Sequence, residues 1–134
     1  AEQCGIDVAP LEERATEELR KVLPPTCVVG NPLDLTGDAN AERYKVAVLA
    51  AARTSGADFF LLVFGDPIPG ACEVVQELRA STGKEVVACY IGGGDTETEE
   101  VRRMHRSGIP VFPTPERAVR AVGALLASHT PERS

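Results

Sequence analysis

The sequence predicts a three-layer α/β/α domain, in which a mostly parallel sheet carries helices on both of its faces. One reason is a pair of short, continuous apolar runs, residues 59–64 and 86–91, each of which is followed by a glycine. Runs of this length are typical of strands that are covered on both sides. The other reason is that these runs alternate with segments of helical periodicity, as in parallel sheets whose strands are joined by helices.

The chain opens with two short pieces and a helix. Residues 1–5 look like the last turn of a helix that Gly5 closes as C-cap, and residues 6–10 read as extended chain. Residues 11–23 predict an amphipathic helix, which the prolines after it end. Its predicted buried face consists of Leu11, Ala15, Leu19, Val22 and Leu23.

A strand and a second helix are expected next. Residues 27–36 read as extended chain, but the strand itself should begin only after Pro32, over about residues 33–36, because proline cannot donate to a ladder in the middle of a strand. The helix over 39–54 has Asp38 or Asn40 available as its N-cap.

The rest of the chain repeats the alternation. Its predicted elements are a strand over 59–64, a helix over 69–80, a strand over 86–91, a helix that Asp95 or Thr96 caps and that ends at Ser107, an edge strand over 109–112, and a helix over 114–128 with Thr114 as N-cap and Pro115 at its first position. We therefore expect the domain to cover residues 1–128 and residues 129–134 to form a tail.

Composition narrows the classes of function. The 134 residues are enough for one domain, and a formal net charge of −6 argues against nucleic acid as a partner, since phosphate binding needs clustered Lys and Arg. No apolar stretch approaches the ~20 residues of a membrane span. The four cysteines form no CxxC pair. We expect a cytoplasmic protein whose Cys27, Cys72 and Cys89 act as small hydrophobic residues.

The chain looks devoid of catalytic machinery. It has neither a GxGxxG fingerprint nor a GxxxxGK[ST] loop, and neither His105 nor His129 has a nucleophile or a carboxylate partner implied by its position. The acidic residues of the stretch 97–100 read as the solvated surface of a helix. No catalytic residue, cofactor site or metal site is predicted.

Ligands of parallel sheets gather at the carboxyl ends of the strands. Four loops should share that rim, and each precedes a helix N-terminus, whose free amides can bind an anion. Asp34 and Asp66 stand out there as carboxylates in loops that follow strands. A structural role for Asp34, as the cap of the following turn, is the other interpretation. The four loops are residues 30–37, 65–71, 92–95 and 112–115.

Three motifs resemble one family. They are Gly30-Asn31-Pro32-Leu33-Asp34-Leu35-Thr36-Gly37 with Ala41-Glu42-Arg43-Tyr44 behind it, Phe64-Gly65-Asp66-Pro67, and the string from Gly108 to Val119. The chain is similar over nearly its whole length to the second succinyl-CoA synthetase-like, flavodoxin-like (Rossmann-like) domain of acyl-CoA synthetases that form ADP or another nucleoside diphosphate. This includes the alpha subunit of acetyl-CoA synthetases.

That resemblance implies a reaction of several domains. Acyl-CoA, phosphate and a nucleoside diphosphate give the free acid, CoA and a nucleoside triphosphate, through an acyl phosphate and a phosphohistidine. The parent enzyme is expected to use CoA, ATP or ADP, phosphate and Mg²⁺, and to have a CoA-binding domain, a phosphohistidine-bearing domain and an ATP-grasp module. This chain alone is expected to be inactive. The resemblance places the organic acid or acyl-CoA near Asn31, Asp34, Thr36, Gly65, Asp66, Pro67 and Ile68.

The same resemblance implies a truncated sheet. In a flavodoxin-like order 2-1-3-4-5 the first strand is the central one, and it has no counterpart here. The gap should fall between the strand at 33–36 and the strand at 59–64, where buried backbone groups would lose partners. A rearranged sheet, an upstream segment, or a strand exchanged with another chain in a homo-oligomer would fill it.

A freestanding flavodoxin-like module for ligand binding or regulation is the alternative. A flavin site is poorly supported because only 4% of the residues are aromatic. A receiver-like phosphorylation site would need a lysine at the end of a strand, whereas Lys84 lies at the start of one. The two classes of function differ in whether the chain works inside a ligase.

Overall fold

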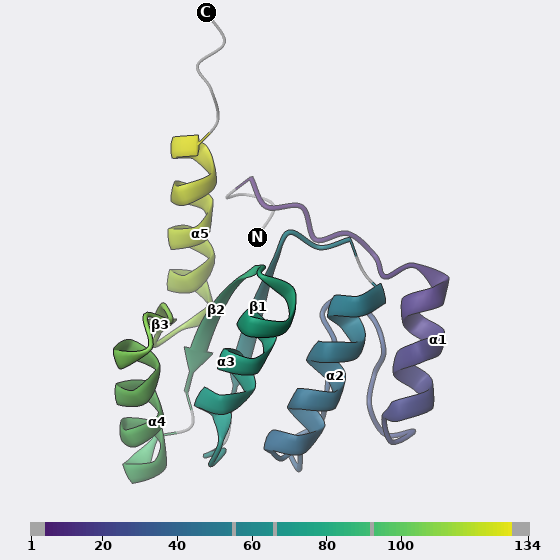
Figure 1. Ribbon diagram of the computed structural model, residues 1–134, viewed down its shortest axis with the longest axis horizontal. Coiled ribbons are helices and arrows are strands. Elements are labelled where there is room, and N and C mark those ends of the chain that lie inside the picture. Colours follow the sequence, from purple (N-terminus) through teal and green to yellow (C-terminus); the bar gives the residue numbers. More distant parts are fainter. Residues whose placement is uncertain (1–4, 55, 66, 92, 130–134) are drawn as a thin grey trace, which may run out of the picture.

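The computed structural model describes residues 5–54, 56–65, 67–91 and 93–129 of the chain. Three parallel strands form one sheet in the order β1-β2-β3, and five helices accompany them (Figure 1). The elements are α1 (Glu13–Val22), α2 (Ala41–Thr54), β1 (Phe59–Phe64), α3 (Ala71–Thr82), β2 (Glu85–Tyr90), α4 (Gly94–Arg106), β3 (Val111–Phe112) and α5 (Pro115–His129). The α/β class and the parallel sheet that the sequence predicts are confirmed.

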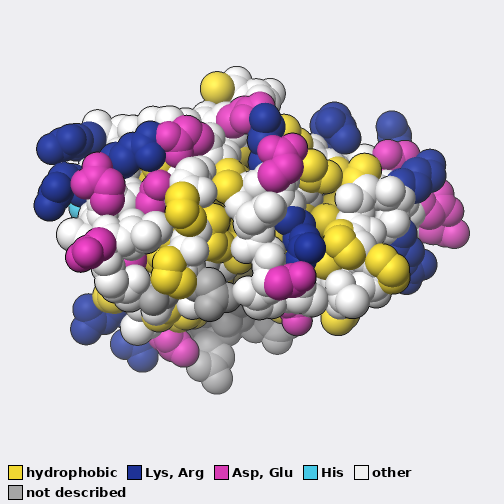
Figure 2. All heavy atoms as spheres, turned by 90° about the horizontal axis from the view of Figure 1, so that it is seen from below, with side chains coloured by type: hydrophobic (Ala, Val, Ile, Leu, Met, Phe, Trp, Pro, Cys, Tyr) yellow, Lys and Arg dark blue, Asp and Glu magenta, His cyan; other side chains and the backbone are white. Residues whose placement is uncertain are grey.

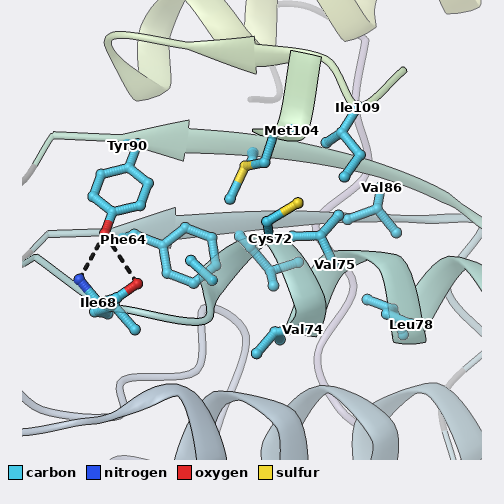
Figure 3. Packing of buried hydrophobic residues seen from close by; sticks show 13 residues of the cluster. Phe64, Ile68, Cys72, Val74, Val75, Leu78, Val86, Tyr90, Met104 and Ile109 are labelled. Carbon is cyan, nitrogen blue, oxygen red and sulfur yellow. Dashed lines mark hydrogen bonds between the residues drawn. The ribbon is translucent and has the colours of Figure 1, made fainter. Parts of the chain in front are cut away.

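Alternate residues of β1 and β2 face opposite sides of the sheet, and each side has its own cover. On one side, Phe64 and Tyr90 pack against α3 and against Met104 of α4 (Figure 3). On the other side, Val87 packs against Ala118 and Val122 of α5. Both apolar runs are therefore covered by helices, which is why they contain no polar position.

The N-terminal helices form a second cluster beside the sheet. Leu19 of α1 is fully buried in this cluster, which also contains residues of α2 and of the segment that joins the two helices. Figure 1 shows α2 next to β1, with α1 on the far side of α2. Tyr44 of α2 packs against this cluster and also against the main core around Phe64. It is a physical link between the two.

The predicted strand at 33–36 is wrong. Asp34 forms an isolated antiparallel bridge with Val28, through two backbone hydrogen bonds of 3.0 Å, and does not join the sheet. The reason is local, because the Asp34 carboxylate accepts the backbone N–H of Thr36 at 2.8 Å and Thr36 has a positive φ of 69°. Among the described residues, no strand pairs with the outer edge of β1. How that edge is completed stays a prediction.

Helix starts were predicted with mixed success. Asn40 caps α2 by accepting the N–H of Arg43, and Thr114 caps α5 by accepting that of Arg117. Neither Asp95 nor Thr96 caps α4, because the helix begins at Gly94, ahead of both, and Gly93 occupies the N-cap position. Gly93 and Gly94 both have a positive φ, of 71° and 82°, which glycine adopts without a steric penalty, and this allows the helix to start early.

Two further expectations concern the N-terminal part. Val22, predicted on the buried face of α1, is 43% exposed, since the helix ends there and only Leu23 turns inward. The helical turn expected before Gly5 lies outside the described residues. At the other end of the chain, the tail expected over 129–134 begins one residue too early, since His129 still belongs to α5, and residues 130–134 lie outside the described residues. No helix in the described part of the chain is long and apolar enough to cross a bilayer.

Candidate functional site

The carboxyl ends of β1 and β2 form one rim of the molecule, together with the N-termini of α2, α3 and α4, all at the lower end of Figure 1. Figure 2 looks onto this rim. Charged side chains of both signs gather at its left, over α4, and hydrophobic side chains are visible between them and the opposite end. The helix starts that follow three of the four predicted loops, those of α2, α3 and α4, thus lie on the same side.

Tyr90 of β2 holds the loop after β1 through hydrogen bonds to its backbone. The Tyr90 hydroxyl accepts the backbone N–H of Ile68 at 2.6 Å and donates to the carbonyl oxygen of the same residue at 3.3 Å (Figure 3). Tyr90 is only 1% exposed, and burial raises the pKa of its hydroxyl. The proton that reaches the Ile68 carbonyl therefore stays in place at neutral pH.

A buried carboxylate holds the other end of the same loop. Glu100 of α4 is 5% exposed, and its two oxygens accept the backbone N–H groups of Gly70 and Cys72, each at 2.9 Å. Arg103 lies 3.4 Å from one of these oxygens and also pairs with Glu73 of α3, which lowers the pKa of the Glu73 carboxyl. The N-terminus of α3 thus already contains an anion that the chain itself supplies.

Sequence reasoning missed Glu100, because it assigned all of residues 97–100 to solvated surface. The available signal was helical spacing: Glu100 precedes Met104 by one turn, and both are buried on the face of α4 that packs against α3. An acidic residue on the buried, apolar face of a helix is expected to have a hydrogen-bond or ion-pair partner. Here the partners are amides of the next helix.

The loop 30–38 forms a compact polar cluster. Asp34 caps the turn at Thr36, as one of its two interpretations predicted. Arg43 of α2 donates to the Leu35 carbonyl and to the Thr36 hydroxyl, both at 3.1 Å, and to the Asp38 carboxylate at 2.8 Å. The hydrogen bond from the Thr36 hydroxyl, followed by that from Arg43, lowers the pKa of Asp38 to about 2.

The two loops approach each other through the start of α2. A Cβ at Gly70, which has a φ of +90°, would lie 3.2 Å from the Cβ of Ala41, so the two helix starts touch. The side chain of Asn31 points elsewhere, since its amide donates to the Ala9 carbonyl at 2.8 Å. Between the described residues of the predicted site, no hydrogen bond joins the loop at 31–36 to the loop at 65–68, and Asp66 lies outside the described residues.

Two further features of the described surface concern its chemistry, a hollow on α4 and the absence of a group of metal ligands. A shallow hollow on the outer side of α4 is lined by Glu97, Thr98, Val101, Arg102, His105 and Arg106, none of them a predicted site residue. Within the described ranges, no group of three or more His, Cys, Asp or Glu side chains could hold a metal ion.

The sequence was compared with family models and with individual known proteins. No family model matches the sequence. The ADP-forming acetate–CoA ligase I of Archaeoglobus fulgidus is 31% identical over 125 residues, which cover 92% of this chain and 18% of that ligase. The alpha subunit of the ADP-forming acetate–CoA ligase II of Pyrococcus furiosus is 30% identical over 91% of this chain and 28% of that subunit. The chain therefore spans less than a third of the length of these relatives.

Solved structures agree. The apo form of the dinucleotide-forming acetyl-coenzyme A synthetase 1 of Ca. Korarchaeum cryptofilum superposes with a TM-score of 0.81 and 29% identity, over 94% of this chain and 29% of that one. The same synthetase in complex with phosphate and ADP gives the same TM-score over 28% of its chain. In sequence and in fold, the chain matches one domain of the ADP-forming acetyl-CoA synthetases, the family that its three motifs resemble.

Proposed function

We propose that this chain serves as the second flavodoxin-like domain of an ADP-forming acyl-CoA synthetase. The complete enzyme converts acyl-CoA, phosphate and a nucleoside diphosphate into the free acid, CoA and a nucleoside triphosphate, and this domain forms part of the acid side of the site. The observation that carries the proposal is the match to such ligases over 92% of the chain, together with the superposition at a TM-score of 0.81.

The substrate-binding residues remain those that the sequence proposes, and the contacts now suggest different roles for them. Asp34 and Thr36 shape their own turn, and the side chain of Asn31 is held by Ala9. The N–H of Ile68 is taken up by Tyr90. We expect Gly65 and Pro67, which are both exposed, to present backbone to the acid. Asp66, the third residue proposed in this loop, lies outside the described residues.

The remaining chemistry is assigned to other domains of the complete enzyme. A phosphohistidine-bearing domain, a CoA-binding domain and an ATP-grasp module would supply the phosphoryl carrier and the sites for CoA, ATP or ADP, phosphate and Mg²⁺. The described part of this chain offers no cluster of metal ligands. We propose that this chain is a scaffold that meets those domains at its rim, and that the complete enzyme is cytoplasmic.

The test uses the complete polypeptide that contains this chain. It is assayed with a panel of acyl-CoAs, phosphate and either ADP or GDP, and nucleoside triphosphate and free CoA are measured. We expect formation of both in equal amounts with at least one acyl-CoA, and none from the isolated chain at the same molar concentration. Absence of turnover with every acyl-CoA would argue against the ligase, and turnover by the isolated chain would contradict the scaffold role. Binding of an acid by the isolated chain alone would favour a freestanding module.

A further inference from the structure

We propose that Glu100 and Tyr90 are positioning residues, which fix the backbone of residues 67–72 in the shape that recognises the organic acid. This inference rests on the proposed function, because it assigns these residues a part in one step of that reaction. Neither residue is expected to touch the acid. Each acts through the backbone of the loop that would.

Burying the carboxylate of Glu100 costs free energy unless hydrogen bonds replace those it made to water. It lies on the buried face of α4, beside the fully buried Met104, where an apolar side chain would pack without losing hydration. What the carboxylate adds is a separate acceptor for each of two amides, those of Gly70 and Cys72. These are groups at the start of α3 that have no partner within their own helix.

The same reasoning applies to Tyr90. Its ring stacks on Phe64 with centroids 5.4 Å apart, a contact that phenylalanine would reproduce. The hydroxyl adds only the two hydrogen bonds to the backbone of Ile68. Tyr90 and Glu100 therefore both use their polar groups to bind the backbone of one short loop, residues 68–72.

The holding groups come from outside the loop, one from β2 and one from α4. Together they engage the amides of Ile68, Gly70 and Cys72, and Gly70 also rests against Ala41 of α2. A loop that is held in this way before the ligand arrives loses less conformational entropy on binding. Its geometry should therefore govern the affinity for the acid more than the affinity for the nucleotide.

The experiment compares Glu100→Gln and Tyr90→Phe with the unmodified complete enzyme and with Glu99→Gln. Glutamine keeps the size of Glu100 but leaves one of the two amides facing an NH₂ group, and Glu99, on the same helix, is 56% exposed and serves as the matched control. Steady-state kinetics of acyl-CoA formation from acid, CoA and nucleoside triphosphate give KM for the acid, KM for the nucleotide and kcat. Hydrogen–deuterium exchange of the peptide that contains residues 67–72 reports on the loop without turnover.

We expect Glu100→Gln to raise KM for the acid about 10-fold and Tyr90→Phe to raise it about 3-fold, with KM for the nucleotide within about 2-fold and faster exchange of the loop in both variants. Glu99→Gln should change neither. Faster exchange with an unchanged KM for the acid, or an equal rise in both KM values, overturns the inference and leaves the ligase assignment intact. An unmodified enzyme that forms no acyl-CoA from acid, CoA and nucleoside triphosphate overturns both. If Glu100→Gln does not fold, Tyr90→Phe decides by the same criteria.

Discussion

The hydroxyl of Tyr44 donates a hydrogen bond to the carbonyl oxygen of Val63, at 3.1 Å. The carbonyl of the next residue, Phe64, accepts the N–H of Ile91 instead, so alternate carbonyls of β1 point to opposite edges. Tyr44 therefore satisfies a backbone group at the end of the outer edge of β1, where no strand pairs within the described residues. A side chain of α2 takes the place of a ladder partner there.

Tyr44→Phe tests this relationship. The variant keeps the ring, which lies 4.8 Å from that of Phe64, and removes only the hydroxyl. We expect the free energy of unfolding to fall by about 1 kcal/mol, as for the loss of one neutral hydrogen bond. Urea denaturation measures the change. Tyr44→Leu, which also removes the aromatic contact, should be less stable than Tyr44→Phe, and equal stability of the two would contradict the role of the ring.

Thr36 is the one described residue other than glycine with a positive φ, 69°, a conformation that strains a β-branched side chain. Thr36→Gly and Thr36→Ala both lose the hydroxyl, but only glycine relieves the strain. We therefore expect the glycine variant to be about 1 kcal/mol more stable than the alanine variant, although glycine normally increases the entropy of the unfolded chain. Thermal or urea unfolding of the pair gives the difference, and a more stable alanine variant would rule out strain at this position.

Asp38 makes stability depend on acid pH. Its pKa is lowered from 3.8 to about 2 by the Thr36 hydroxyl and then by Arg43, so the folded chain favours the charged form. The resulting stabilisation is fully present above pH 4 and is lost as the pH falls through the folded pKa. We expect Asp38→Asn to flatten the fall of Tm between pH 4 and pH 2. NMR titration of the Asp38 carboxyl in Arg43→Gln should show its pKa move upward, and an unchanged value would leave Arg43 without influence.

The cysteines should differ in reactivity. Burial raises the pKa of both the Cys72 and the Cys89 thiols, which lowers the fraction of reactive thiolate and also blocks access, whereas Cys27 is half-buried. At pH 8 we expect iodoacetamide to modify Cys27 at least about 10-fold faster than Cys72 or Cys89. Peptide mapping by mass spectrometry separates the sites. In urea the rates should converge, and a difference that persists after unfolding would show that burial is not the cause.

The sequence was most informative where periodicity and burial agree. The runs at β1 and β2 are apolar because helices cover both sides of each, and the caps at Asn40 and Thr114 follow from local chemistry. It misled at residues 33–36, where the Asp34 side chain competes with a ladder for the local backbone. Such competition leaves no mark in the apolar pattern.

The site was less predictable than the fold, because its contacts join residues that are far apart in the chain. The resemblance named the loop around Ile68, but nothing in that loop indicates that Tyr90 and Glu100 hold it. Glu100 follows two other glutamates of the same helix, Glu97 and Glu99, and only its position one turn before Met104 distinguishes it. Partners that are 22 to 30 residues apart in the chain can be identified only in the structure.

The order of the strands has a kinetic consequence. In β1-β2-β3 each strand pairs with its nearest predecessor in the chain, so Phe59 lies opposite Glu85 and Ala88 lies opposite Val111, with a single helix in each connection. Each of these contacts closes a shorter loop than one that skips a strand would, and therefore costs less chain entropy. We expect residues 59–129 to fold early, and the helix pair α1–α2 to dock afterwards against a sheet that already exists.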